Sequence, residues 1–167
     1  MTPADFDTLF AYSGNCQEQL RRELLRDQGL FTKPFTTTSQ YNTIQKLLAH
    51  CIGAEERWIT ARIQGRPLPV IYEERAADTI ESLFEDARTI RSASDALRRS
   101  LSASDYQRVI PVSMPQWGVA LELSLVDIFF HILNHENYHR GQVVSLLQQN
   151  GCDPPNFDYV FLKLAGL

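Results

Sequence analysis

Hydrophobic side chains recur at helical spacing in four long segments of the chain. In each segment they return every three or four positions, the interval that places side chains on one face of an α-helix. The segments cover residues 2–27, 40–64, 78–101 and 124–149. Amphipathic helices of this length bury their apolar faces against one another, so the pattern predicts an all-α protein built as a four-helix bundle.

Start and stop signals flank these segments. A Ser, Thr or Asp followed by an acidic residue, or by proline at the first helical position, is typical of a helix N-terminus. Glycine just beyond the last apolar residue is typical of a helix end. The start signals are Thr2 before Pro3, Asp78 with Glu81, and Ser124 with Asp127. The stop signals are Gly29, Gly65 and Gly151.

The connections are too long for tight antiparallel turns, which predicts long crossover connections. Between the third and fourth helices, the segments 108–112 and 117–121 are rich in β-branched and apolar residues and predict a short β-like hairpin or loop. The apolar tail, 157–162, is expected to dock on the bundle. No linker or repeat interrupts the pattern, so we expect a single domain over 1–167.

Composition narrows the classes of function. The formal net charge is −4, which lacks the basic character of a nucleic-acid-binding protein. The 3 cysteines form no Cys-x-x-Cys pair, which argues against a disulfide framework or a cysteine zinc site. No signal peptide or membrane-length apolar stretch is visible. We therefore expect a cytoplasmic protein that binds neither nucleic acid nor membrane.

The histidines are the unusual feature of the composition. Of the 4 in the chain, His131, His135 and His139 stand at i, i+4 and i+8 of the last predicted helix, and His50 lies on the apolar side of the second. Stacked imidazoles in an apolar core are costly unless each finds a partner, and a divalent ion can bind one nitrogen of each ring. The i, i+4 pair with a ligand from a facing helix predicts a metal site. Because helical drift turns His131 about 80° from His139, its role stays open between ligand, support and wall residue.

The stretch from His135 to His139 also reads H-E-x-x-H. In zinc peptidases with this pattern the glutamate is the general base, which makes Glu136 a candidate proton acceptor. No histidine follows His139 to supply the usual third ligand, and little sequence is left for a peptide-binding strand. A salt-bridged or solvated position is the alternative for Glu136.

The sequence resembles the DinB family, also called DinB/YfiT-like, of metal-dependent bundles. The resemblance rests on Asn134 and the run His135-Glu136-Asn137-Tyr138-His139-Arg140-Gly141-Gln142, which match the family signature N-H-x-x-x-H-R-G-Q, and on His50 in the second helix. It extends over most of the chain.

The resemblance implies a three-histidine site in which His50, His135 and His139 hold a divalent metal ion, zinc or nickel, completed by water. It also implies a homodimer and, as in some relatives, a thiol transferase or isomerase that uses a low-molecular-weight thiol. The alternatives are a non-enzymatic stress-response bundle with a structural metal, and an H-E-x-x-H metallohydrolase.

Overall fold

A four-helix bundle forms the body of the structure, a computed structural model that describes residues 1–75, 79–115 and 118–164. The long helices in this part of the chain are α1 (Pro3–Arg26), α3 (Ile44–Glu56), α4 (Ile80–Ser100) and α5 (Leu125–Gln149). Shorter helices are α2 (Gly29–Thr32), the π-helix η1 (Arg57–Ile63), the 3-10 helices η2 (Tyr72–Glu74) and η3 (Asp105–Gln107), and α6 (Tyr159–Leu164). The prediction of an all-α bundle is confirmed.

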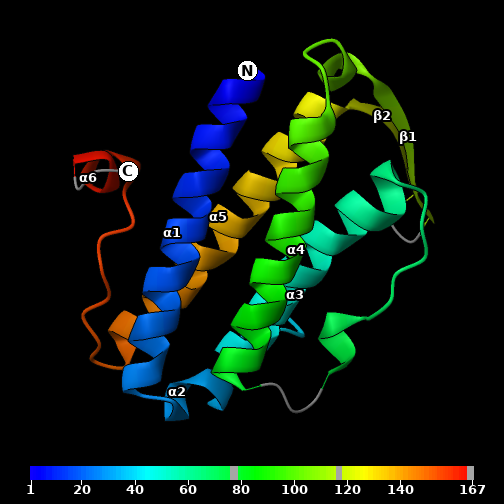
Figure 1. The fold of residues 1–167 in the computed structure, drawn as a ribbon. Coiled ribbons are helices and arrows are strands. Elements are labelled where there is room, and N and C mark those ends of the chain that lie inside the picture. Colours follow the sequence, from blue (N-terminus) through cyan, green and yellow to red (C-terminus); the bar gives the residue numbers. More distant parts are fainter. Residues whose placement is uncertain (76–78, 116–117, 165–167) are drawn as a thin grey trace.

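Consecutive long helices of the bundle are not all adjacent and antiparallel. α1 packs against α4 and α5, and α3 packs against the same two helices. α1 and α5 run in one direction along the bundle while α3 and α4 run in the other (Figure 1). Because α3 and α4 are parallel, the chain between them must return along the length of the bundle, and η2 lies on this crossover. The predicted long crossover is therefore present between the second and third long helices.

Two predicted helix starts are confirmed in detail. The hydroxyl of Thr2 accepts the backbone N–H of Asp5, and the hydroxyl of Ser124 accepts that of Asp127; both acidic side chains accept the N–H of the capping residue in return. The cap of α4 differs from the expected one. Thr79 caps this helix in the same reciprocal way with Ser82, and the predicted Asp78 lies outside the described residues.

Other predicted boundaries were wrong. Gly29 does not end α1; the helix ends at Arg26, and Gly29 begins α2, where its N–H donates to the side chain of Asp27 at 3.2 Å. The second long helix starts at Ile44 rather than at residue 40, because the hydroxyl of Thr43 accepts the N–H of Lys46 and caps it there.

The hairpin between α4 and α5 consists of β1 (Val109–Met114) and β2 (Val119–Ser124), which pair antiparallel from Val109 opposite Ser124 to Met114 opposite Val119. The second strand starts later than predicted, and Trp117 lies outside the described residues. The tail docks as expected: Tyr12 of α1 donates its hydroxyl proton to the carbonyl of Phe157 at 2.5 Å. Within the described ranges no helix is long and apolar enough to cross a membrane.

The core of the bundle has two apolar halves. One contains Leu20, Leu24, Ile52, Leu83 and Val143 among others, and the second contains Phe6, Phe10, Tyr106, Ile128 and Phe129 among others. Five buried polar and charged side chains from all four long helices lie between these halves, and we call them the polar belt: Ser13, Glu55, Arg91, Ser94 and Glu136.

The polar belt is closely hydrogen-bonded. Arg91 lies 2.9 Å from Glu55 and 2.8 Å from Glu136, and Ser94 donates to Glu55 at 2.7 Å. Ser13 donates to Glu136 as well. Burial by itself lowers the pKa of the Arg91 guanidinium, but its two carboxylate partners raise it above its ordinary value overall. Buried charges persist when they are paired in this way.

Candidate metal centre

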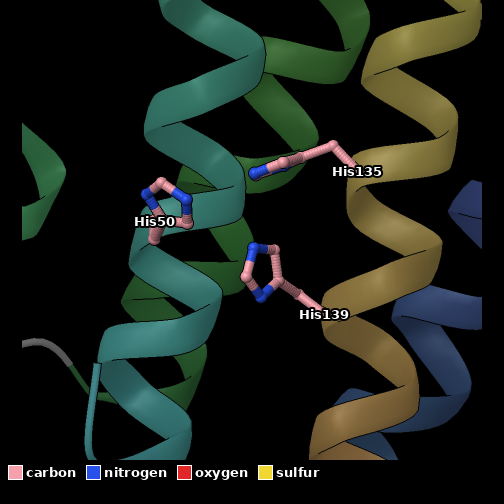
Figure 2. Close-up of side chains that lie close together, drawn as sticks. All are labelled: His50, His135 and His139. Carbon is pink, nitrogen blue, oxygen red and sulfur yellow. The ribbon is translucent and has the colours of Figure 1, made fainter. Parts of the chain in front are cut away.

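Three histidines meet between α3 and α5, beside the polar belt. One potential ligand atom from each of His50, His135 and His139 lies within 4.8 Å of the other two. Figure 2 shows the three rings facing one another across the space between the helices, each with a nitrogen directed into it. In the described part of the chain this is the one group of three or more metal-ligating side chains placed to share an ion.

The local sequence accounts for this placement. His135 and His139 are one turn apart on α5, so their side chains project from the same face, and the two ring centroids lie 4.6 Å apart. His50 stands one turn after Leu47, whose side chain is in the core, and therefore points from α3 towards α5. The long crossover leaves α3 and α5 as direct neighbours, which brings the ring of His50 within 4.9 Å of that of His135.

In His50 and His139, a hydrogen bond at the ring nitrogen that faces away from the centre indicates which nitrogen carries the proton. Nδ1–H of His50 donates to Oε1 of Glu73 at 3.1 Å, and Nδ1–H of His139 donates to Oε1 of Gln142 at 2.7 Å. A neutral imidazole that donates from Nδ1 keeps its lone pair on Nε2, the nitrogen left to face the centre. Histidines that bind metals are commonly oriented by such an acceptor on the other nitrogen.

The surroundings of His135 and His139 favour the neutral form of both rings. Burial, together with the neighbouring His139, His50 and His131, lowers the pKa of His135 to about 3. Burial also lowers the pKa of His139, although its hydrogen bond to Gln142 acts in the opposite direction. A neutral imidazole is the form that binds a metal ion, so both residues fit the role of ligands near neutral pH.

Glu73 contacts His50 directly, and the sequence did not indicate this carboxylate. It lies on η2, and its carboxylate also pairs with Arg57 at 2.7 Å. Burial by itself raises the pKa of Glu73, but the hydrogen bond from His50, the backbone N–H of Glu73 itself and the charge and hydrogen bond of Arg57 outweigh it and lower the pKa to about 2. The carboxylate is therefore ionised. Nothing in the local sequence pattern marks this residue, because its place depends on the path of the crossover.

Aromatic rings border the centre. The ring of Tyr41 stacks on that of His50, with centroids 4.1 Å apart and planes 19° apart, and the edge of Tyr138 meets His139 at 5.0 Å. A small cavity beside His135 is lined by Trp58, Cys51 and Gln17, among others. These contacts narrow the approach to the histidines and limit the water around them.

His131 lies outside the group of three. Its ring is 5.6 Å from that of His135 and 5.0 Å from that of Trp58, and the residue is largely exposed. Burial against its neighbours lowers its pKa. The geometry makes His131 a neighbour of the ligand set on the side of Trp58, in agreement with the helical drift that the sequence predicts.

The carboxylate of Glu136 belongs to the polar belt. It is held by Arg91 and Ser13, with Arg140 at 3.5 Å, and the residue is buried. This is the salt-bridged alternative for the glutamate of the H-E-x-x-H pattern. Its role as a proton acceptor stays a prediction, and the acceptor sites of the carboxylate are already engaged.

The donor set fits a divalent ion. Three neutral imidazoles are ligands that zinc, nickel, copper and iron accept, and sites with three protein ligands keep a position for water or substrate. His50, His135 and His139 would hold the ion, and Glu73 and Gln142 would orient two of them.

Comparisons with known proteins agree with the fold. In a search of the solved structures, a DinB-like protein from Bacillus cereus ATCC 10987 superposes with a TM-score of 0.69 at 17% sequence identity, over 93% of this chain and 97% of that one. The search of curated proteins returned no match. The family model described as "DinB family" matches residues 23–165, which include all three histidines of the centre. The chain belongs to the DinB family.

Proposed function

We propose that the protein binds one divalent metal ion, zinc or nickel, through His50, His135 and His139, and that it is a metal-dependent enzyme that transfers or adds a low-molecular-weight thiol to a small-molecule substrate. The observation that carries the proposal is the convergence of three imidazole ligand atoms within 4.8 Å, two of them on rings whose other nitrogen is hydrogen-bonded.

The absence of charge on the three imidazole ligands supports a role for the metal ion in activating a nucleophile. The ligands are neutral, so the ion would keep its full charge at the site. When bound in this way, a divalent ion lowers the pKa of a bound water towards about 7 and favours the thiolate form of a thiol. The chain's own part is to favour the neutral form of His135 and His139, to orient His50 and His139 through Glu73 and Gln142, and to border the site with aromatic rings.

The two alternatives have less support from the geometry. A structural zinc site is normally closed by four protein ligands, whereas the group among the described residues has three. A metallohydrolase of the H-E-x-x-H type needs a glutamate free to accept a proton beside the ion, whereas the carboxylate of Glu136 pairs with Arg91 at 2.8 Å.

Metal analysis tests the first half of the proposal. Protein purified without a histidine tag should take up one equivalent of zinc or nickel after reconstitution, measured by mass spectrometry of the dialysed sample. Uptake below about a tenth of an equivalent, unchanged by reconstitution, would overturn the metal site.

Cobalt substitution tests the thiol. Adding a small thiol to the cobalt-loaded protein should produce a sulfur-to-cobalt charge-transfer band, and the matching methyl thioether, which has no ionisable S–H, should not. A spectrum that the thiol leaves unchanged would contradict thiol chemistry and leave the metal site intact.

A further inference from the structure

Glu73 reaches the metal centre from outside the four long helices. Its Oε1 atom accepts Nδ1–H of His50 at 3.1 Å and pairs with Nη1 of Arg57 at 2.7 Å. Its Oε2 atom is buried, with no hydrogen-bond partner among the described residues. A carboxylate in this position has given up part of its hydration, so the side chains of His50 and Arg57 and its own backbone N–H hold it in place.

The carboxylate of Glu73 packs against the surface of α3. His50, Gly53 and Arg57 follow one another at intervals of three and four residues, so they lie along one stripe where α3 continues into η1. A Cβ atom at Gly53 would lie 2.8 Å from Oε2 of Glu73 and 3.1 Å from Nη1 of Arg57. Any side chain at position 53 would therefore push the carboxylate away from the place it takes beside His50.

The ring of His50 is fixed on two sides. Tyr41 stacks on one face with planes 19° apart, and Glu73 accepts the Nδ1 proton at the ring edge. In water a neutral histidine side chain favours the proton on Nε2, which would block the nitrogen that faces His135 and His139. An ionised acceptor at Nδ1 selects the opposite tautomer.

We propose that Glu73 is the positioning residue of the metal centre: its carboxylate holds the proton of His50 on Nδ1 and thereby turns the Nε2 lone pair towards His135 and His139, while Arg57 holds the carboxylate and Gly53 gives it space. The inference rests on the proposed function for the identity of the centre. It adds that η2, on the crossover between α3 and α4, supplies a residue that orients His50, so this segment does more than connect two helices.

The tautomer can be measured without metal. In the metal-free protein, nitrogen-15 NMR of the histidine rings should show His50 protonated on Nδ1. Glu73→Ala should move it towards the Nε2–H form, whereas Glu73→Gln, which keeps an acceptor oxygen, should retain the Nδ1–H form. Glu74→Ala, at the exposed neighbouring position of η2, is the matched control and should leave the spectrum unchanged.

Metal affinity is the second readout, measured by competition with a chromophoric chelator. Glu73→Ala should weaken zinc binding about 10–100-fold, the usual effect of removing a group that orients a ligand. Glu73→Gln should restore most of the loss, and Glu74→Ala should bind as the wild type does. Gly53→Ala should reproduce the Glu73→Ala phenotype, because the new methyl group displaces the carboxylate.

The outcomes separate this inference from the proposed function. Wild-type tautomer and affinity in Glu73→Ala, with circular dichroism showing that it is folded, would overturn the role of Glu73 while the metal site stands. Failure of the wild type to take up either zinc or nickel would overturn the proposed function, and the tautomer of His50 in the metal-free variants would still decide on Glu73. If Glu73→Ala does not fold, Gly53→Ala provides the same decision, because it displaces the carboxylate and leaves Glu73 in the chain.

Discussion

The guanidinium group of Arg91 on α4 lies 2.8 Å from the carboxylate of Glu136 on α5, and both side chains are buried. Glu136, between His135 and His139 in the sequence, is therefore oriented into the polar belt. We expect Glu136→Gln to lower the free energy of unfolding by about 1–3 kcal/mol, because it removes a buried charge-assisted hydrogen bond. Its zinc affinity should stay within a few-fold of wild type.

Urea unfolding and chelator competition on the same sample check both parts of this prediction. Glu122→Gln, on the exposed side of β2, is the control and should change neither quantity. Metal-dependent cleavage of a peptide library by the wild type, lost in a stable Glu136→Gln, would instead establish the hydrolase alternative.

Zinc affinities of single alanine variants should distinguish the three proposed ligands from His131, which lies beside them. His50→Ala, His135→Ala and His139→Ala each remove one of three donors, and we expect zinc affinity to fall at least about 100-fold in each. His131→Ala should retain affinity within about threefold, since His131 lies outside the group of three. Titration with a competing chelator measures all four. A His131→Ala variant as weak as the other three would place His131 among the ligands.

The stability of the metal-free protein should fall as the pH is lowered through the range in which histidine titrates. Burial and the neighbouring rings lower the pKa of His135 from 6.5 to about 3. As the pH drops below about 6.5, His135 therefore becomes protonated in the unfolded chain while it stays neutral in the folded chain. This difference in proton binding favours unfolding. This loss continues down to about pH 3 and is reversed on raising the pH.

Urea titrations between about pH 7 and about pH 5 measure this effect before most carboxylates begin to titrate. His135→Gln, which has no titratable group, should show a shallower dependence on pH. An equal slope in the variant and the wild type would show that His135 does not contribute to it.

Removal of the metal should leave the fold in place. The two apolar halves of the core contain none of the three histidines, so hydrophobic burial does not depend on an ion. We expect unchanged helical circular dichroism in chelator. Zinc at about 100 times its dissociation constant should add about 2.7 kcal/mol to the free energy of unfolding by mass action. Loss of helical signal in chelator would favour the structural-metal alternative.

The bundle and the pairing of the two histidines on α5 could be predicted because their signals are local. The capping box of Ser124 and Asp127 and the apolar periodicity fix the helix, and the i, i+4 spacing then places His135 beside His139 whatever the rest of the chain does. The placement of His50 opposite them followed from its position on the apolar side of its own helix and from the family resemblance.

The surroundings of the centre could not be predicted in this way. Glu73 and Tyr41 contact His50 from segments with little regular structure, and their positions depend on the path of the chain in three dimensions. The H-E-x-x-H pattern suggested a catalytic role for Glu136. Its partner Arg91 is 45 positions away and reaches it across the core of the bundle, so it could be identified only once the helices were arranged in three dimensions. Helix ends were misplaced where a nearer capping residue, such as Thr43, formed the cap instead.

The polar belt also bears on how the four helices are aligned along their axes. Apolar side chains can pack in several axial alignments of two helices. A shift of one helix by a turn, about 5.4 Å, therefore costs little packing free energy when both contacting faces are apolar. A slip of that size between α3 and α4 would separate Arg91 from Glu55 and leave both charges buried and unpaired. The belt therefore excludes the shifted alignments. Because His50 and Glu55 lie on the same helix, the ion pairs that fix its height also fix the height at which His50 meets His135 and His139.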